Sequence, residues 1–101
     1  MRAILVVNPK GGSGKTTLST NLAGYLASTG KRVAILDLDR QKSATAWLAM
    51  RDMALPDIEL MREGQKNDSD WLVIDSPAGL HGKNLERALK LAHKVVVPIA
   101  P

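Results

Sequence analysis

The sequence predicts an α/β fold in which a mostly parallel sheet is flanked by helices. Short apolar runs rich in Ile, Leu and Val alternate along the chain with segments of helical periodicity. A glycine-rich loop separates the first apolar run from the first helical segment. Because strands that alternate with helices form parallel sheets with right-handed crossovers, these observations define the fold class. The chain has 101 residues, enough for one domain at most.

The first strand and helix are predicted on either side of the glycine-rich loop. Arg2–Val7 has the composition of a buried strand, and Asn8–Gly14 forms the loop. A helix is predicted over Thr16–Thr29, beginning near Lys15, with Gly30 as its C-cap. The residues at helical spacing within it are Leu18, Leu22, Tyr25 and Leu26.

A second strand and helix follow. Val33–Leu38 is a continuous apolar run, as expected of a strand buried on both faces. Ala44–Met53 is predicted to be a helix that Pro56 ends. Its apolar stripe, which we expect to pack in the core, consists of Trp47, Met50 and Met53.

The remaining segments predict three further strands, one of them short, and one helix. Ile58–Met61 is a possible short strand, which we expect at the sheet edge or antiparallel, because Arg62–Asp70 is too short for a usual parallel crossover. Trp71–Ile74 and Val95–Ile99 are the third and fourth confident strands. The helix between these two strands is marked by Leu85, Ala88, Leu89 and Ala92.

The composition excludes several classes of protein. The absence of cysteine rules out disulfides, thiolate zinc sites and cysteine-ligated clusters. No apolar run approaches the ~18 residues of a membrane span, so we expect a cytoplasmic protein. The formal charge of +4 is spread along the chain, which favours a solvated surface over a dedicated anion-binding patch. His81 and His93 have no second ligand at metal-site spacing.

The segment from Lys10 to Thr17 predicts a phosphate-binding loop. It lies between a strand and a helix, which is the context that such a loop requires. Glycines allow the backbone N–H groups to curl around a phosphate, and the helix adds its positive end. We expect Lys15 to bind the β- and γ-phosphates and the Thr16 hydroxyl to bind Mg²⁺. The predicted nucleotide-binding residues are Lys10, Gly11, Gly12, Ser13, Gly14, Lys15, Thr16 and Thr17.

This loop departs from the general pattern in a specific way. Pro9 replaces the usual first glycine, and Lys10 follows it. Residues 8–17 therefore resemble the deviant Walker A motif of the ParA/MinD family. Within that family, they resemble the loop of small plasmid-partition proteins such as ParF. The resemblance implies a P-loop NTPase fold with ATP and Mg²⁺ as cofactors. It also implies an ATP-dependent homodimer in which Lys10 reaches the phosphates bound by the partner subunit.

Three carboxylates are predicted at the ends of neighbouring strands. Asp37 and Asp39 close the second strand, and we expect both to point to the same side. The segment resembles the family's D-x-D-P-Q motif, which implies that Asp37 helps to hold the Mg²⁺ shell and that Asp39 orients the attacking water. Arg40 stands where the family has proline. Asp75 ends the third strand as a Walker B carboxylate does, and residues 75–79 resemble the family's γ-phosphate-sensing segment.

Together these residues predict a Mg²⁺-dependent ATPase, and the resemblance implies that it partitions plasmids or chromosomes or positions other cargo. The expected catalytic residues are Lys10, Lys15 and Asp39. The expected metal ligands are Thr16, Asp37 and Asp75. Two alternatives remain open at this point: a P-loop metabolic enzyme, such as a synthetase or a kinase, and a nucleotide-binding fragment that does not hydrolyse ATP.

The resemblance covers most of the chain and implies a longer domain. Domains of the family are about twice this length, so residues 1–101 are expected to be its N-terminal half, truncated after the fourth confident strand. We expect this half alone to have little ATPase activity. For the full-length protein, the resemblance implies a ParB-like adaptor, nonspecific DNA as a partner, and a place in the bacterial cytoplasm or on the nucleoid.

Overall fold

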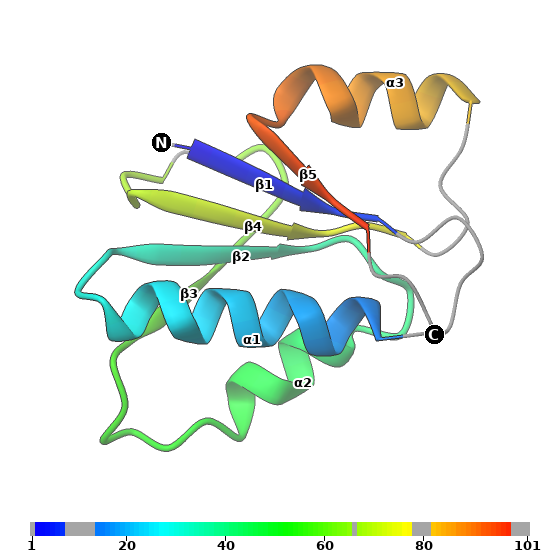
Figure 1. Cartoon of the computed structure of the whole chain (residues 1–101). Coiled ribbons are helices and arrows are strands. Elements are labelled where there is room, and N and C mark those ends of the chain that lie inside the picture. The colour runs from blue at the N-terminus through cyan, green and yellow to red at the C-terminus, as the bar shows by residue number, and fades with distance from the viewer. Residues whose placement is uncertain (1, 8–13, 66, 78–81, 98–101) are drawn as a thin grey trace.

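The fold is a five-stranded parallel sheet in the order β3-β2-β4-β1-β5, with helices on both faces (Figure 1). The structure is a computed structural model that describes residues 2–7, 14–65, 67–77 and 82–97, with only the backbone of Leu91. The predicted α/β fold class is confirmed. The strands are β1 (Arg2–Val6), β2 (Val33–Asp37), β3 (Ile58–Met61), β4 (Trp71–Asp75) and β5 (Lys94–Val96).

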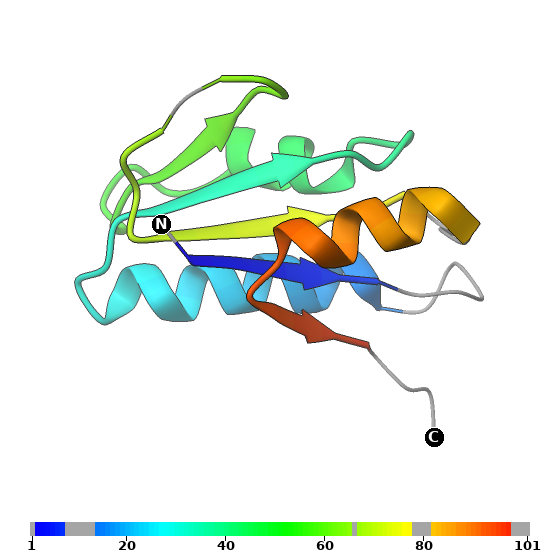
Figure 2. The same cartoon turned by 90° about the horizontal axis from the view of Figure 1, so that it is seen from above.

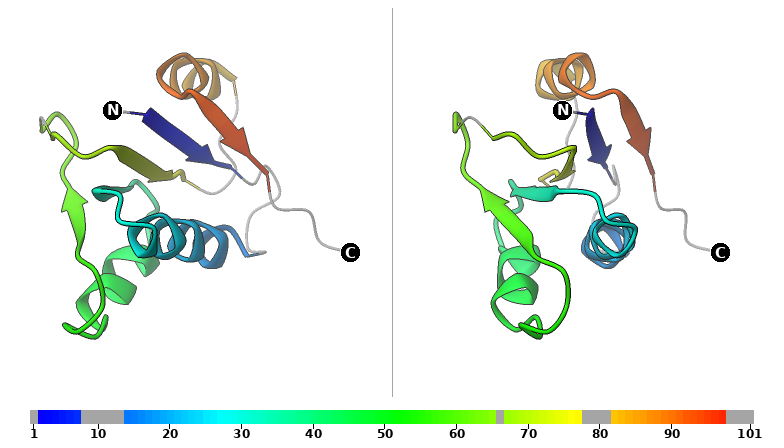
Figure 3. Two further views of the ribbon diagram at one scale, coloured as in Figure 1. Left: turned by 60° about the vertical axis from the view of Figure 1, so that its left-hand side comes forward. Right: turned by 90° about the vertical axis from the view of Figure 1, so that its left-hand side faces the viewer.

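Within the described residues, three helices cover the sheet unequally. They are α1 (Lys15–Ser28), α2 (Ser43–Ala49) and α3 (Gly82–Leu91). Helices α1 and α2 lie on one face, and α3 lies on the other, over β1 (Figures 1 and 3). Helix α1 follows β1 in the chain and crosses β4 to reach β2, so its first turn lies at the carboxyl edge of the sheet. The predicted phosphate loop precedes this turn in the sequence.

The core consists of two apolar layers, one on each face of the sheet. Alternate residues of a strand point to opposite faces, and the central strands are covered on both sides, so their sequences are continuously apolar. The layer under α1 and α2 is built from Val6, Ala23, Ala27, Val33, Ile35, Ala44 and Val73. The layer on the α3 face is built from Ala3, Leu5, Val7, Ala34, Leu72 and Ile74.

Gly30 ends the first helix as predicted, although it stands one residue beyond the C-cap, which is Thr29. Gly30 has a φ of 86°, a left-handed conformation that glycine adopts without the Cβ clash of other residues. Its N–H donates to the Ala27 carbonyl, and the Lys31 N–H donates to the Leu26 carbonyl. This pair of bonds is the Schellman arrangement, which satisfies carbonyls that the end of the helix would otherwise leave unpaired.

Two predicted apolar stripes are only partly correct. In α1, Leu18, Leu22 and Leu26 pack on the core, but Tyr25 is 66% exposed because the alanines Ala23 and Ala27 occupy the innermost positions. The second stripe keeps Trp47 against the core, whereas Met50 and Met53 are 86% and 96% exposed.

The end of α2 explains the error in the second stripe. The helix stops at Ala49, well before Pro56, so helical spacing no longer applies to the residues beyond it. The Asp52 side chain accepts the Ala54 N–H at 2.9 Å, and the Leu55 N–H donates to the Asp52 carbonyl. An aspartate that bonds the backbone two residues ahead favours a turn over continued helix.

Strand β3 lies at the sheet edge, as predicted, but it runs parallel to β2 rather than antiparallel. The argument from loop length was wrong because it assumed a helical crossover. From the end of β3 the chain must return about four residues along the strand direction and cross two strand spacings, roughly 16 Å in all. The nine residues from Arg62 to Asp70 can span about 30 Å when extended, which is sufficient without a helix.

Strand β5 forms the opposite edge of the sheet (Figure 2). It pairs with β1 in parallel. A strand was predicted at residues 95–99, of which 98 and 99 lie outside the described residues. His93 attaches the preceding turn to β1: its Nδ1 accepts the Ala3 N–H and its own N–H donates to the Ala3 carbonyl, both at 2.9 Å. None of the helices in the described ranges combines the length and apolarity needed to cross a bilayer.

Candidate functional site

The candidate site lies where the carboxyl ends of β1, β4 and β2 meet. Val6 is paired with Asp75, and Asp75 is paired with Asp37, so the ends of these three strands are level. Ligands of parallel α/β sheets bind at this edge. Of the predicted phosphate loop, Lys10, Gly11, Gly12 and Ser13 lie outside the described residues. The structure does place Gly14, Lys15, Thr16 and Thr17.

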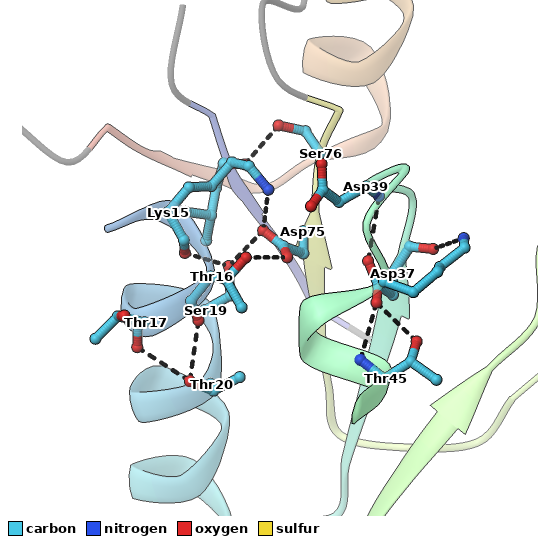
Figure 4. Close-up of polar contacts among 12 residues, drawn as sticks. Lys15, Thr16, Thr17, Ser19, Thr20, Asp37, Asp39, Thr45, Asp75 and Ser76 are labelled. Carbon is cyan, nitrogen blue, oxygen red and sulfur yellow. Dashed lines mark hydrogen bonds and ion pairs between the residues drawn. The ribbon is translucent and has the colours of Figure 1, made fainter. Parts of the chain in front are cut away.

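The first turn of α1 points its polar side chains at β4. The Lys15 ammonium group lies 2.6 Å from Asp75 Oδ1, and the two side chains are 6% and 0% exposed (Figure 4). The Thr16 hydroxyl donates to the other carboxylate oxygen, Oδ2, at 3.1 Å. A buried carboxylate is stable in this environment because a cation and hydrogen-bond donors satisfy it.

Ser19 is a third α1 residue on the same carboxylate, and the sequence analysis missed it. Its hydroxyl is completely buried, 3.0 Å from Asp75 Oδ1 and 2.9 Å from the Lys15 carbonyl. Since a hydroxyl has one hydrogen, these two acceptors share it. Ser19 stands four residues after Lys15, hence on the same face of the helix, and that spacing was the signal that could have identified it.

The chain after β4 is fixed between its two neighbours. The buried Ser76 hydroxyl donates to the Val6 carbonyl at 2.7 Å, and the Asp75 carbonyl accepts the Leu38 N–H at 2.9 Å. These bonds hold the strand ends on both sides of Asp75 in register. In the predicted γ-phosphate-sensing segment, Ala78 and Gly79 lie outside the described residues.

Asp37 and Asp39 do not form the expected pair of strand-end carboxylates. Strand β2 ends at Asp37, and Asp39 lies two residues beyond it, where the chain turns. The Asp39 N–H donates to Asp37 Oδ1 at 3.1 Å. Thr45 donates to Asp37 Oδ2 through both its N–H and its hydroxyl, at 2.9 and 2.7 Å. Figure 4 shows Asp39 on the side of Asp37 nearer to Ser76, with Thr45 on the other side.

The start of α1 suits an anionic ligand. Its N-cap residue, Gly14, has no side chain that could cap it, and its first turn contains no acidic residue. Gly14 precedes the helix with a φ of 79°, so the chain enters α1 through a left-handed residue. The positive end of the helix dipole and the first N–H groups therefore face the segment predicted to surround a phosphate.

The oxygen atoms beside Lys15 fit a magnesium ion. Magnesium prefers hard oxygen ligands about 2.1 Å away in an octahedron, so adjacent ligands lie about 3 Å apart. Thr16 Oγ1 and Asp75 Oδ2 are 3.1 Å apart. The described residues contain no group of three or more His, Cys, Asp or Glu side chains that could hold a metal ion. A nucleotide-bound Mg²⁺ needs only one or two protein carboxylates because phosphates and water complete its shell.

A family model described as the CobQ/CobB/MinD/ParA nucleotide binding domain matches residues 4–101. The chain belongs to this family. The ParA/MinD resemblance proposed from the loop is thereby confirmed.

Individual relatives agree with this assignment. The chain is 35% identical over 109 residues to "Maintenance of carboxysome distribution protein A" of Gloeobacter kilaueensis, covering 99% of this chain and 50% of that protein. It is 55% identical over 51 residues to the chromosome-partitioning ATPase Soj of Thermus thermophilus, covering 50% of this chain and 20% of Soj.

A solved structure, pNOB8 ParA bound to nonspecific DNA, has the same fold, with a TM-score of 0.75 and 20% identity. The similarity covers 96% of this chain and 53% of that one. The chain thus spans about half the length of the relatives that it matches along its whole length.

Proposed function

We propose that this ParA/MinD-family chain is the nucleotide-binding part of a Mg²⁺-dependent ATPase. The observation that carries the proposal is the convergence of Lys15 and Thr16, from the first turn of α1, on the buried Asp75 carboxylate at the end of β4. A cation, a hydroxyl and a carboxylate at one point are what MgATP requires from such a site. The family assignment supports ATP as the ligand.

Each residue has a distinct part in the proposed reaction. Bound Mg²⁺ would neutralise charge on the phosphates, and Thr16 and Asp75 would hold it. Lys15 exchanges its contact with Asp75 for the β- and γ-phosphates, because both compete for one ammonium group. Asp39 accepts a hydrogen bond from the attacking water and so orients it. Phosphoryl transfer needs little else from a protein than such positioning and charge.

The wider role of the full-length protein is proposed from its relatives. Soj is described as a chromosome-partitioning ATPase, and the Gloeobacter relative is named for carboxysome distribution. We therefore propose a cytoplasmic protein that dimerises on ATP to partition DNA or to position cargo, with a ParB-like adaptor. Lys10 would reach the partner's phosphates in that dimer. The similarity to a ParA bound to nonspecific DNA supports DNA as a further ligand.

Two measurements test the proposal. Calorimetric titration of the chain with ATP, with and without Mg²⁺, tests binding. Release of inorganic phosphate, with and without added DNA, tests hydrolysis by the chain and by its longer form. The expected result is Mg²⁺-dependent binding and slow phosphate release to water. Transfer of the γ-phosphate to an added amino or carboxyl compound would instead identify a kinase or synthetase, and binding without any release would identify a nucleotide-binding module.

A further inference from the structure

The contacts of Asp37 point to a role other than the metal ligation implied by the family motif. Its carboxylate is only 6% exposed, and each oxygen already accepts a hydrogen bond from the protein. With the Thr45 hydroxyl as a third donor, three of about four lone-pair positions are used. A metal ion at Asp37 would have to displace these donors.

These donors lie just beyond β2, at Asp39, and in the first turn of α2, at Thr45. Lys42, at the N-cap position of α2, makes no side-chain cap bond. The acceptor for the N–H of Thr45 in the first turn comes instead from Asp37, eight residues earlier in the chain. Accepting a hydrogen bond from the N–H of the third helical residue is the usual role of an N-cap side chain. Asp37 therefore caps α2 from the end of β2.

The backbone of the segment between β2 and α2 is strained and closed by a further bond to Asp37. Lys42 is the one non-glycine residue in the described ranges with a positive φ, 53°, which L-residues rarely adopt. Its ammonium group donates to the Asp37 carbonyl at 2.7 Å. Asp37 thus contacts Asp39, Lys42 and Thr45, and these contacts fix the turn that carries Asp39.

We propose that Asp37 is a positioning residue, which together with Thr45 holds the Asp39 turn in place, and that it contributes no oxygen to the Mg²⁺ shell. The inference rests on the proposed function for the role of Asp39, but the contacts that it invokes exist independently of ATP hydrolysis. Asp37→Asn replaces one acceptor oxygen with an N–H donor, so one of the two sets of bonds is lost.

The test compares Asp37→Asn, Thr45→Val and the double variant with the parent chain. Amide hydrogen exchange at Asp39 and Thr45 measures how firmly the turn is held. Binding of a fluorescent ATP analogue at increasing Mg²⁺ concentrations measures the affinity of the site for the metal. Phosphate release measures turnover. Thr45→Ser restores the hydroxyl. Thr29→Val is the matched control, because the Thr29 hydroxyl bonds the Leu26 carbonyl at the far end of α1.

The expected result separates positioning from metal ligation. In Asp37→Asn, exchange should accelerate at least about tenfold at Asp39 or at Thr45, whichever then faces the amide nitrogen, since its charge-assisted bond is lost. Turnover should fall about tenfold in each single variant and little further in the double variant, because both act on one cluster. The Mg²⁺ concentration for half-maximal nucleotide binding should stay within about twofold of the parent, and Thr45→Ser and Thr29→Val should resemble the parent.

A contrary result is equally clear. The inference is overturned if Asp37→Asn raises the half-saturating Mg²⁺ concentration tenfold or more while Thr45→Val changes neither exchange nor binding. Unprotected Asp39 and Thr45 amides in the parent would overturn it too. Absence of phosphate release from the parent and its longer form would refute the proposed function alone, since exchange and Mg²⁺ dependence would still decide the role of Asp37.

Discussion

The Lys15 ammonium group and the Asp75 carboxylate form a buried ion pair at 2.6 Å between residues 60 positions apart in the chain. Removing one partner of such a pair is costly, because the other charge stays buried without compensation. The same ammonium group is the one proposed to bind phosphates. The pair therefore links the stability of this edge of the sheet to its ligand chemistry, and substitutions here should change both.

Lys15→Ala should lose nucleotide binding and stability together. We expect at least a tenfold to hundredfold fall in ATP affinity, from the loss of a charge-assisted contact to phosphate. We also expect about 3–5 kcal/mol of destabilisation, from the unpaired Asp75. Calorimetry and urea unfolding measure the two effects. Lys31→Ala, an exposed lysine beyond the other end of α1, is the control, and equal ATP affinity of Lys15→Ala and parent would refute the assignment.

Asp75→Asn should remove the effect of Mg²⁺ on nucleotide binding. The substitution keeps the size of the side chain but takes away the charge that would hold the ion near Thr16. ATP affinity is measured with Mg²⁺ and with a chelator. In the parent, Mg²⁺ should strengthen binding, and in the variant the two affinities should converge. An undiminished Mg²⁺ effect would show that Asp75 does not serve the metal.

Asp39→Ala should bind ATP but hydrolyse it poorly. The side chain is half-buried beyond the end of β2 and is proposed to orient water rather than to hold phosphate. Removal of one such positioning group costs on the order of a hundredfold in rate. Single-turnover phosphate release beside nucleotide titration separates rate from binding. Asp57→Ala, an exposed aspartate before β3, is the control, and parental turnover by Asp39→Ala would exclude the water-orienting role.

Alanine should change the free energy of unfolding in opposite directions at Gly24, within α1, and at Gly30, just after it. Gly30 has a φ of 86°, so Gly30→Ala should destabilise the chain by about 1–2 kcal/mol. Gly24 lies within α1, where an added Cβ would meet only the side chains of Arg51 and Trp47, at 3.9 and 4.0 Å. Gly24→Ala should stabilise by about 0.5–1 kcal/mol through helix propensity. Thermal unfolding compares both with the parent, and a shared sign would contradict the account.

Two large apolar residues of similar size should contribute differently to stability because one is buried and the other is exposed. Leu5 is completely buried at the centre of β1, whereas Met53 is 96% exposed. Leu5→Ala should cost about 2–5 kcal/mol, from lost transfer energy and the cavity left behind. Met53→Ala should remain within about 0.5 kcal/mol of the parent, because it changes only a solvated side chain. Urea unfolding measures both, and comparable losses would place Met53 in a packed environment.

Much of the candidate site at the carboxyl edge of the sheet was predictable, because the sequence patterns that indicate it involve residues close together in the chain. The apolar runs fixed the four confident strands, and the loop sequence placed Lys15 and Thr16 at the start of a helix. Asp75 was predictable because it is a single acidic residue directly after an apolar strand. The exposure of Met50 was not predictable from spacing, because it depends on where α2 ends, and the Asp52 turn decides that.

The amino-acid sequence by itself determined the order of strands and helices, the phosphate-loop motif and its family. These features rest on contacts between residues close in the chain, where periodicity and turn chemistry act directly. Only the tertiary structure decided that β3 is parallel, that Ser19 reaches Asp75, and that Asp37 caps α2 through Thr45. Sheet packing brings these groups together, and a distant hydrogen bond depends on where the whole fold places its donor and acceptor.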